Sequence, residues 1–182
     1  VADDEGEGFW SGLFDELKDR GMKGVKLVVS DGHKGIQSAV QSRFLGVAWQ
    51  LCQVHFSRAV LRNIPNKDKE EVAGKLKEAL EDENKMKELA VELHNKKHSK
   101  SAKTIDSFSQ DIWNYRAFPR EHWKRIRTTN GLERINKELK RRSRVVGAFP
   151  NDRSLLRLAA AILMDINEEW LIGRKYLSME EE

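Results

Sequence analysis

The sequence has a single cysteine and no long apolar run among its 182 residues. One cysteine, Cys52, excludes an intramolecular disulfide framework and is typical of a protein from a reducing compartment. No stretch approaches the roughly 18 consecutive apolar residues of a membrane-spanning helix, and the N-terminal residues do not resemble a secretory signal peptide. We therefore expect a soluble cytoplasmic protein with no membrane partner.

Charge is distributed unevenly along the chain, although the net charge is only +4. Residues 1–25 carry 3 basic and 7 acidic side chains, and residues 158–182 carry 2 basic and 6 acidic ones. Residues 116–157 carry 13 basic and 4 acidic side chains, a net charge of +9. Such a concentration of cations indicates binding to nucleic-acid phosphates, with a solvated helix face as the alternative.

The first third of the chain has the pattern of alternating helices and strands. Apolar residues recur at helical spacing from Phe9 to Leu17, and Gly21 is placed to end that helix. The β-branched run 25–31 predicts a buried strand, residues 34–44 predict a helix, and residues 46–52 predict a second strand. A strand–helix–strand connection of this length implies that the two strands are parallel.

Residues 66–104 lack proline, contain one glycine, and mix 10 basic with 9 acidic residues. Their apolar residues repeat at helical spacing, so we expect an all-helical segment inserted between two α/β parts. Aromatic residues dominate the apolar positions from Phe108 to Trp123, and residues 155–171 predict a last amphipathic helix.

Residues 128–142 predict a helix that begins with Thr and Asn capping residues and then gathers cations. Leu132, Ile135 and Leu139 form an apolar stripe that we expect to pack inward, with Glu133 beside it. Glu133 has two interpretations. It can complete a capping box with the backbone N–H of Asn130, or it can be a functional carboxylate at the start of a basic helix.

Asp31 is the second candidate carboxylate, because it follows the first buried strand, where parallel sheets bind ligands. The alternative is an N-cap for the helix that starts near Lys34. Asp31 and Glu133 are 102 positions apart, so only the fold can bring them together. Two carboxylates facing one point hold divalent cations, and Mg²⁺ accepts few carboxylates with phosphate and water completing its shell.

Cys52 and His55 form a Cys-x-x-His motif directly after the second strand. A structural zinc site needs four ligands, and His94 and His98 could complete one. Their spacing of four predicts that both lie on one helix face, but the segment is distant and contains no second cysteine. A buried cysteine with a nearby histidine is the other interpretation. Nothing singles out the further partners that a cysteine protease requires.

Four ordered motifs give this chain a clear family resemblance. It resembles the mutator-type transposases of bacterial insertion sequences over essentially its whole length, and residues 169–180 look like the C-terminus of that family. The motifs lie at residues 28–36, 52–56, 127–138 and 145–151.

The resemblance implies an α/β fold with an RNase H-like core, truncated at its N-terminus and interrupted by an all-helical insertion. On this view residues 1–65 and 116–182 belong to the core and residues 66–115 form the insertion. It implies DDE-type chemistry, in which Asp31 and Glu133 are the second and third carboxylates and ligate Mg²⁺. Cys52 and His55 match the Cys-x-x-His signature of the family and are candidates for supporting the site.

The same resemblance implies double-stranded DNA as the partner, both as element ends and as target, with self-association on DNA and a bacterial, nucleoid-associated location. We expect DNA phosphates to contact Arg134, Lys137, Lys140 and Arg141. The first catalytic Asp of the family lies on a strand upstream of Val1, and Asp3, Asp4 and Asp15 do not occupy its motif. The chain is therefore expected to be inactive alone. Two alternatives stay open: a non-catalytic DNA-binding or regulatory fragment, and another RNase H-fold nuclease.

Overall fold

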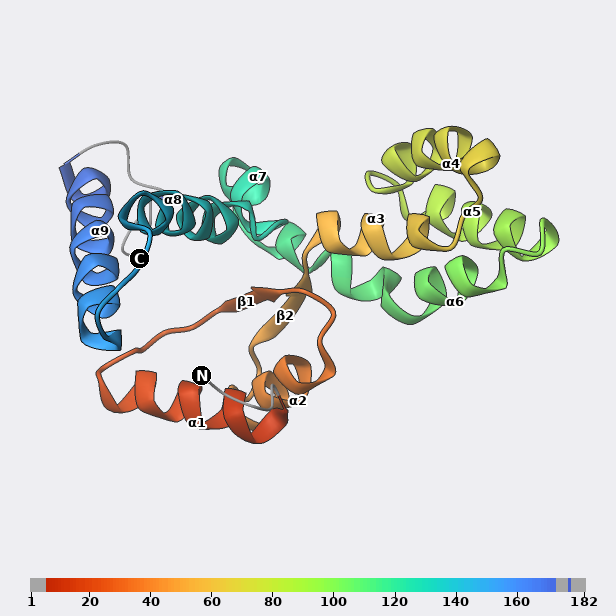
Figure 1. Cartoon of the computed structure of the whole chain (residues 1–182). Helices are drawn as coiled ribbons and strands as arrows, with labels where there is room; N and C mark the ends of the chain where they lie inside the picture. The colour runs from red at the N-terminus through yellow and green to blue at the C-terminus, as the bar shows by residue number, and fades with distance from the viewer. Residues whose placement is uncertain (1–5, 173–176, 178–182) are drawn as a thin grey trace. The chain divides into compact units, whose positions relative to one another are not determined.

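The computed structural model describes residues 6–172 and residue 177, and within them the chain is mostly helical (Figure 1). The chain divides into two compact units, one up to Thr128 and one from Thr129 onward. The first unit contains the strands and most of the buried residues. The second is built on two long helices.

A two-stranded parallel sheet lies in the first unit. Strand β1 (Leu27–Ser30) pairs with β2 (Ala48–Leu51), with Leu27 opposite Ala48 and Ser30 opposite Leu51. Helix α2 (Lys34–Arg43) connects them. The N–H of Cys52 donates to the Ser30 carbonyl at 2.8 Å, which extends the ladder one step beyond the strands. The predicted parallel strand pair is thereby confirmed.

Helix α1 (Glu7–Asp19) packs against α2. The rings of Phe14 and Phe44 meet edge to face at 5.1 Å, and the Arg43 guanidinium lies 3.3 Å from the Asp15 carboxylate. Gly21 has a φ of +98°. Its N–H donates to the Lys18 carbonyl, and the N–H of the following residue donates to the Leu17 carbonyl. This pair of bonds is a Schellman motif, in which the left-handed position favours glycine. Gly21 therefore ends α1 as predicted.

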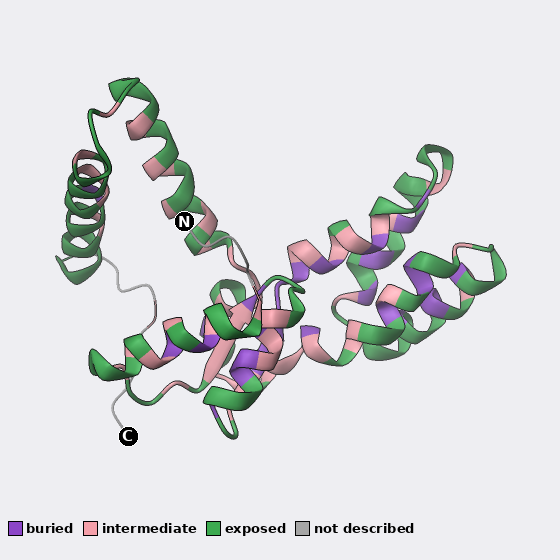
Figure 2. Ribbon diagram, turned by 60° about the horizontal axis from the view of Figure 1, so that its bottom comes forward, coloured by how far each residue is buried: buried purple, intermediate pink, exposed green. Residues whose placement is uncertain are grey.

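Four helices form the rest of the core of this unit: α3 (Gln53–Arg62), α4 (Asn66–Ala79), α5 (Glu83–Asn95) and α6 (Ser99–Phe108). Helix α5 contacts α4 and α6, and α6 also contacts α3. Figure 2 shows their buried residues gathered on the faces that meet one another. The fully buried residues include Val60, Val72, Leu76, Met86, Leu93, Ala102 and Ile105. The predicted helical character of residues 66–104 is confirmed.

Short helical turns follow α6 and are fastened to β2 by polar side chains. They are η1 (Ser109–Ile112), η2 (Asn114–Ala117), η3 (Arg120–His122) and α7 (Trp123–Ile126). The Asn114 amide donates to the Trp49 carbonyl at 2.6 Å. Gln50, fully buried, accepts from the N–H of Tyr115 at 3.0 Å. These bonds satisfy buried polar groups and hold the turns to the strand.

The second unit contains α8 (Asn130–Val146) and α9 (Asp152–Ile172), which contact each other. Arg142 of α8 lies 3.5 Å from Asp165 of α9. The expectation that the apolar stripe of α8 packs inward is wrong for Leu132, which is 59% exposed, whereas Ile135 and Leu139 are half-buried. Leu132 lies ten residues, about 15 Å of helix, from the Arg142 contact.

The sheet alone does not identify the fold family. A parallel strand pair joined by a helix is compatible with the predicted α/β class, but it occurs in many folds of that class. The RNase H-like core therefore stays a prediction. So does the division into segments 1–65, 66–115 and 116–182, because an inserted segment can pack into the same compact unit as its host.

Candidate functional site

Asp31 directly follows β1, and its side chain is exposed. Its Oδ1 accepts a hydrogen bond from the N–H of His33 at 3.3 Å. The alternative that Asp31 is the N-cap of α2 is wrong, because His33 occupies that position. An N-cap side chain binds N–H groups two or three positions further along, inside the helix. One carboxylate oxygen is thus oriented by the backbone, and Asp31 has no ion pair among the described residues.

Cys52 and His55 lie at the end of the neighbouring strand. Cys52 is fully buried and is the N-cap residue of α3, and His55 is half-buried in the first turn of that helix. Because Ser30 pairs with Leu51 in a parallel ladder, Asp31 and Cys52 occupy the next step at the same edge of the sheet. The sequence predicted this shared edge. The supporting roles of Cys52 and His55 stay predictions.

The four-ligand zinc set that the sequence permitted does not form. His94 lies 3.1 Å from Asp106, and His98 lies 3.5 Å from Asp68. The prediction that both histidines share one helix face is wrong, because α5 ends at Asn95 and Lys97 adopts a φ of +64°. Over the described part of the chain, no three His, Cys, Asp or Glu side chains are grouped to hold a metal ion.

Glu133 lies in the first turn of α8, as predicted, and is half-buried. The helix starts at Asn130 with Thr129 as N-cap, so Glu133 is one position too far along for the capping box that the sequence suggested. Its N–H donates to the Thr129 carbonyl at 3.0 Å. The Thr129 hydroxyl lies 3.5 Å from the Glu133 carboxylate. The positive end of the helix favours an anionic side chain here.

Glu133 belongs to the cationic face of α8, defined as the row of side chains that lines a shallow hollow along this helix. The row repeats at three- and four-residue steps, the spacing of one helix face, and consists of Glu133, Asn136, Lys137, Lys140, Arg141 and Arg144. At about 100° per residue, Glu133 lies about 100° around the helix from Leu132 of the apolar stripe and about 160° from Ile135.

Arg141 has a partner on its own helix, which the sequence prediction overlooked. Its Nη2 and Nε donate to the two Glu138 carboxylate oxygens at 2.7 and 2.9 Å, and Arg142 donates to the same group at 2.8 Å. Hydrogen bonds from Arg141 and then Arg142 lower the pKa of Glu138 to about 2. The charge of Arg141 is thus compensated. The three- and four-residue spacing from Glu138 is the signal that could have revealed these pairs.

The other cations of this face remain available. Lys137, Lys140 and Arg144 are exposed, and none forms an ion pair with any residue that the structure describes. Arg134, also a predicted phosphate contact, is one residue, about 100°, from Glu133 and therefore lies at the margin of the face. Arg144 and Asn136 complete the row, although neither was among the predicted DNA contacts.

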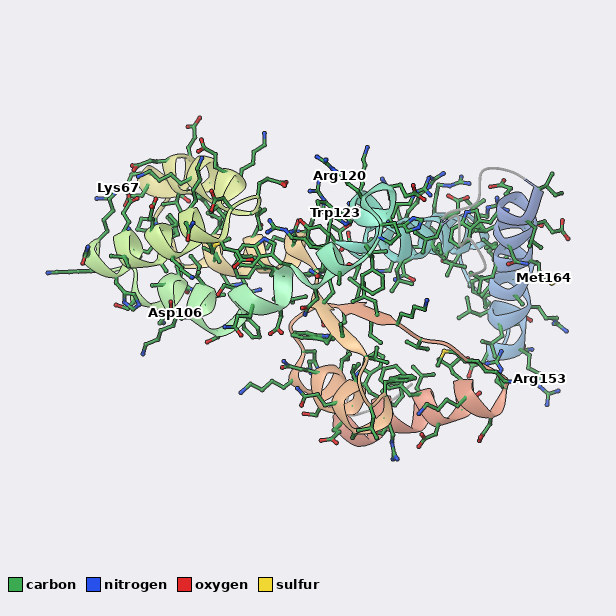
Figure 3. All side chains as sticks on the ribbon, turned by 180° about the vertical axis from the view of Figure 1, so that it is seen from behind. Lys67, Asp106, Arg120, Trp123, Arg153 and Met164 are labelled. Atoms are coloured by element: carbon green, nitrogen blue, oxygen red, sulfur yellow. The ribbon has the colours of Figure 1, made fainter. Side chains whose placement is uncertain are left out.

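Arg120, an exposed cation of the first unit, lies against an aromatic ring. Figure 3 shows Arg120 next to Trp123, and the Arg120 guanidinium lies over the Trp123 ring at 5.8 Å. The indole N–H of Trp123 donates to the Phe118 carbonyl at 2.7 Å, and its ring meets Tyr115 edge to face at 5.4 Å. The ring is therefore held in place, and it offers Arg120 a cation–π partner without neutralising its charge.

Asp31 and Glu133 belong to different compact units. We expect the carboxylates of Asp31 and Glu133 to lie within about 10 Å of each other, because the two metal ions lie about 4 Å apart. This distance stays a prediction. Asp15, one of the aspartates outside the family motif, forms an ion pair with Arg43 on α2. Asp3 and Asp4 lie outside the described residues, as does most of the C-terminal motif at residues 174–180.

Comparison with known proteins gives a consistent family assignment. The model of the family "Transposase, Mutator family" matches residues 1–173. The transposase for insertion sequence element IS256 in transposon Tn4001 of Staphylococcus aureus is 37% identical over 188 residues, which cover 99% of this chain and 48% of that protein.

Two further relatives agree with it. The transposase for insertion sequence element IS406 of Burkholderia multivorans is 35% identical over 98% of this chain and 47% of its own length. The transposase for IS1081 of Mycobacterium tuberculosis is 32% identical over 94% and 42%. The chain thus spans about half the length of the curated relatives it matches. Among the described helices, none has the length and apolar character needed to cross a membrane.

Proposed function

The chain belongs to the mutator family of transposases, and we propose that it supplies such an enzyme with a DNA-binding helix face and two carboxylates of a Mg²⁺-dependent site. The intact protein is a DDE-type transposase. It cuts phosphodiester bonds with water and joins the resulting 3′-hydroxyl to target DNA. Double-stranded DNA is its partner, and its location is the nucleoid.

The cationic face of α8 is the observation that carries this proposal. Lys137 and Arg144 are seven residues apart, which places three uncompensated cations over about 10 Å of helix. A DNA duplex presents about one phosphate charge per 1.7 Å along its axis, so such a row meets several phosphates at once. Arg120 in the first unit offers a further phosphate contact.

Glu133 supports a metal ion at this face. A carboxylate in a row that binds phosphates repels the same phosphates, so its position is unfavourable for DNA binding alone. Asp31 and Glu133 would hold a divalent cation, whose charge would offset the repulsion between carboxylate and phosphate. Carboxylate oxygens of Asp31 and Glu133 suit Mg²⁺, which keeps several waters and accepts few protein ligands. When bound, a pair of such ions activates the attacking oxygen and stabilises the leaving one.

The residues of this chain have simpler tasks in that reaction. The N–H of His33 orients the Asp31 carboxylate, and the first turn of α8 presents Glu133. Lys137, Lys140 and Arg144 hold the phosphates on either side of the reacting bond, with His55 supporting the site from the neighbouring strand end. A third carboxylate comes from the part of the relatives that this chain does not span.

In this proposal, the same part of the relatives completes an RNase H-like sheet. Over the described residues β1 pairs on one edge only, and Leu27, Val28 and Val29 are half-buried, whereas Trp49, Gln50 and Leu51 of β2 are buried. Parallel strands are normally covered on both faces, and two strands alone are marginally stable. A further strand along β1 accounts for both features.

DNA binding tests the proposal directly. We expect the chain to bind unrelated duplexes, with affinity falling steeply between about 50 and 200 mM salt. Replacing Lys137 and Lys140 by alanine should lower affinity for every duplex and flatten the log–log salt slope by about two units. The matched control is Lys67→Ala with Lys100→Ala, two exposed lysines of the first unit. Equal losses of DNA affinity from both pairs would show that the α8 face is a solvated helix surface and not a DNA-binding one.

A further inference from the structure

The connection between α8 and α9 presents a group of exposed apolar residues to which the proposed function gives no role. Val145 is 81% exposed and Val146 is 49% exposed. Ala148 and Pro150, which follow them, are also exposed, and Phe149 is half-buried. We call the four exposed residues the apolar tip. The tip falls within the fourth of the sequence motifs described above.

Neither packing nor helix formation accounts for the valine pair at the end of α8. Valine is an unfavourable residue for an exposed helical position, because branching at Cβ restricts its side chain there. Burial would compensate for this cost, but most of the Val145 side chain faces solvent. Single exposed apolar residues are ordinary in soluble proteins, whereas a contiguous group marks an interaction surface.

Backbone hydrogen bonds hold the apolar tip in a defined shape. Gly147 has a φ of +76° and a ψ of −79°, and the N–H of Ala148 donates to the Val146 carbonyl at 3.0 Å. This bond between residues i and i+2 is a γ-turn with a positive φ, which glycine adopts at low cost. At the other end, the Asn151 side chain accepts from the N–H of Ser154 at 3.0 Å and caps α9. A surface fixed in this way loses little conformational entropy when it binds.

The charges beside the tip identify its partner. Arg144, the last residue of the cationic face of α8, directly precedes the tip, and Arg153 follows it in the first turn of α9. Figure 3 shows Arg153 projecting from this helix. Both arginines are exposed, and neither forms an ion pair with a residue that the structure describes. Asp152, exposed at the start of α9, is the only acidic residue between them. Positive charge therefore predominates on the two sides of the tip.

This combination matches the way in which many proteins distort DNA through its minor groove. Cationic side chains hold the phosphates, while an apolar side chain enters between two base pairs and partly unstacks them. Val145 is one residue, about 100° of rotation and 1.5 Å of rise, from Arg144. A duplex bound to the cationic face of α8 therefore lies within reach of the tip.

We propose that the apolar tip is a DNA wedge, which enters the minor groove of a duplex bound to the cationic face of α8 and opens a base step there. This inference rests on the proposed DNA-binding face, but not on any metal ligand. Unstacking costs free energy, which the additional contacts of the distorted duplex offset. The wedge therefore favours positions that are already weakly stacked, such as a mismatch.

Competition between a matched duplex and the same duplex with one central mismatch tests the wedge in the full 182-residue chain. We expect the parent to bind the mismatched duplex at least about fivefold more tightly, because its central step is already weakly stacked. Val145→Ser with Val146→Ser should abolish this preference and leave the log–log salt slope unchanged, since no phosphate contact is lost. The matched control is Leu156→Ser with Met164→Ser, two apolar residues of α9 that are each 65% exposed. This control should keep the preference.

A larger side chain tests the wedge in the opposite direction. The base analogue 2-aminopurine, placed beside the mismatch, fluoresces more strongly when its neighbours unstack. Its fluorescence should rise when the parent binds, rise further with Val145→Phe, and stay unchanged with Val145→Ser and Val146→Ser combined. Circular dichroism of each variant verifies that the fold is retained.

The possible outcomes separate this inference from the proposed function. A chain that binds both duplexes equally, with a steep salt dependence, would overturn the wedge and leave the DNA-binding face standing. A chain that binds neither duplex would overturn both.

Two other results would assign the tip to a different partner. Binding to phosphatidylserine vesicles that the two serine substitutions abolish, without any preference for the mismatch, would show that the tip meets a membrane surface instead. Protection of Val145→Cys from thiol reagents in a DNA-free protein of the relatives' full length would show that another segment covers the tip. Either result would overturn the wedge.

Discussion

Replacing Glu138 by glutamine should strengthen DNA binding, because this carboxylate compensates the charge of a predicted phosphate contact. Arg141 donates two hydrogen bonds to Glu138, whereas Lys137 and Lys140 have no acidic partner among the described residues. Glutamine keeps the length and one acceptor oxygen but removes the negative charge. Arg142 retains Asp165 as a partner, so the change releases mainly Arg141.

The expected magnitude follows from counterion release. Each additional phosphate contact steepens the log–log salt slope by about 0.9, which corresponds to about an eightfold gain in affinity for each tenfold dilution of salt. Glu138→Gln should therefore steepen the slope by about one unit. Arg141→Ala should change the DNA affinity of the parent less than twofold. In the Glu138→Gln background, the same substitution should lower the DNA affinity about eightfold.

Fluorescence anisotropy with a labelled duplex, recorded over a salt series, measures each corner of this double-mutant cycle. Glu88→Gln, which makes the same charge change at an exposed position of α5, is the control for net charge. The pKa of Glu138 is lowered to about 2 by Arg141 and Arg142, so the pair is intact over the working pH range and pH cannot mimic the substitution. Equal losses from Arg141→Ala and Lys137→Ala in the parent would refute the reasoning.

Two further predictions concern stability. Lys97 adopts a φ of +64° at the C-terminus of α5, so Lys97→Gly should relieve strain and raise the free energy of unfolding by about 1 kcal/mol, and with it the melting temperature. Lys103→Gly, at an exposed position inside α6, should lower both by a similar amount. Hydrogen bonds from Lys75 and Lys96 lower the pKa of Glu71 to about 2, so its stabilising effect is complete above the unfolded-state pKa of about 4.5 and is lost as pH falls toward 2. Thermal melts should therefore show Glu71→Gln below the parent at pH 6, with the difference vanishing near pH 2.

The sequence predicted the local positions of the site well, because short-range physics determines them. A β-branched run followed by a helix specifies a buried parallel strand, so Asp31 and Cys52 could be placed at strand ends. Gly21 ends α1 because its left-handed conformation is costly for any side chain with a Cβ. The break between His94 and His98 was missed for the converse reason. It relies on a lysine in the conformation that glycine normally takes.

Another error concerns a side chain rather than an element. The burial of Leu132 depends on which part of α8 the neighbouring helix α9 covers, and no local sequence pattern determines that. The distance between Asp31 and Glu133 is a long-range property of the fold and stays a prediction. The two residues are 102 positions apart and lie in different compact units.

The same long-range property governs the prediction about activity. Asp31 and Glu133 supply two carboxylates, whereas the charge of two divalent ions and the carboxylate triad of a DDE site require a third. We therefore expect the purified 182-residue chain to bind DNA but to show no Mg²⁺-dependent cleavage or joining above background in a plasmid-nicking assay. A protein of the relatives' full length should be active, and Glu133→Gln there should abolish turnover without lowering DNA affinity, because glutamine keeps the shape of the side chain and removes a charge that repels phosphates. Glu169→Gln, an exposed acid on α9, is its control. Mg²⁺-dependent cleavage by the short chain that survives Glu133→Gln would show that the catalytic carboxylates lie elsewhere.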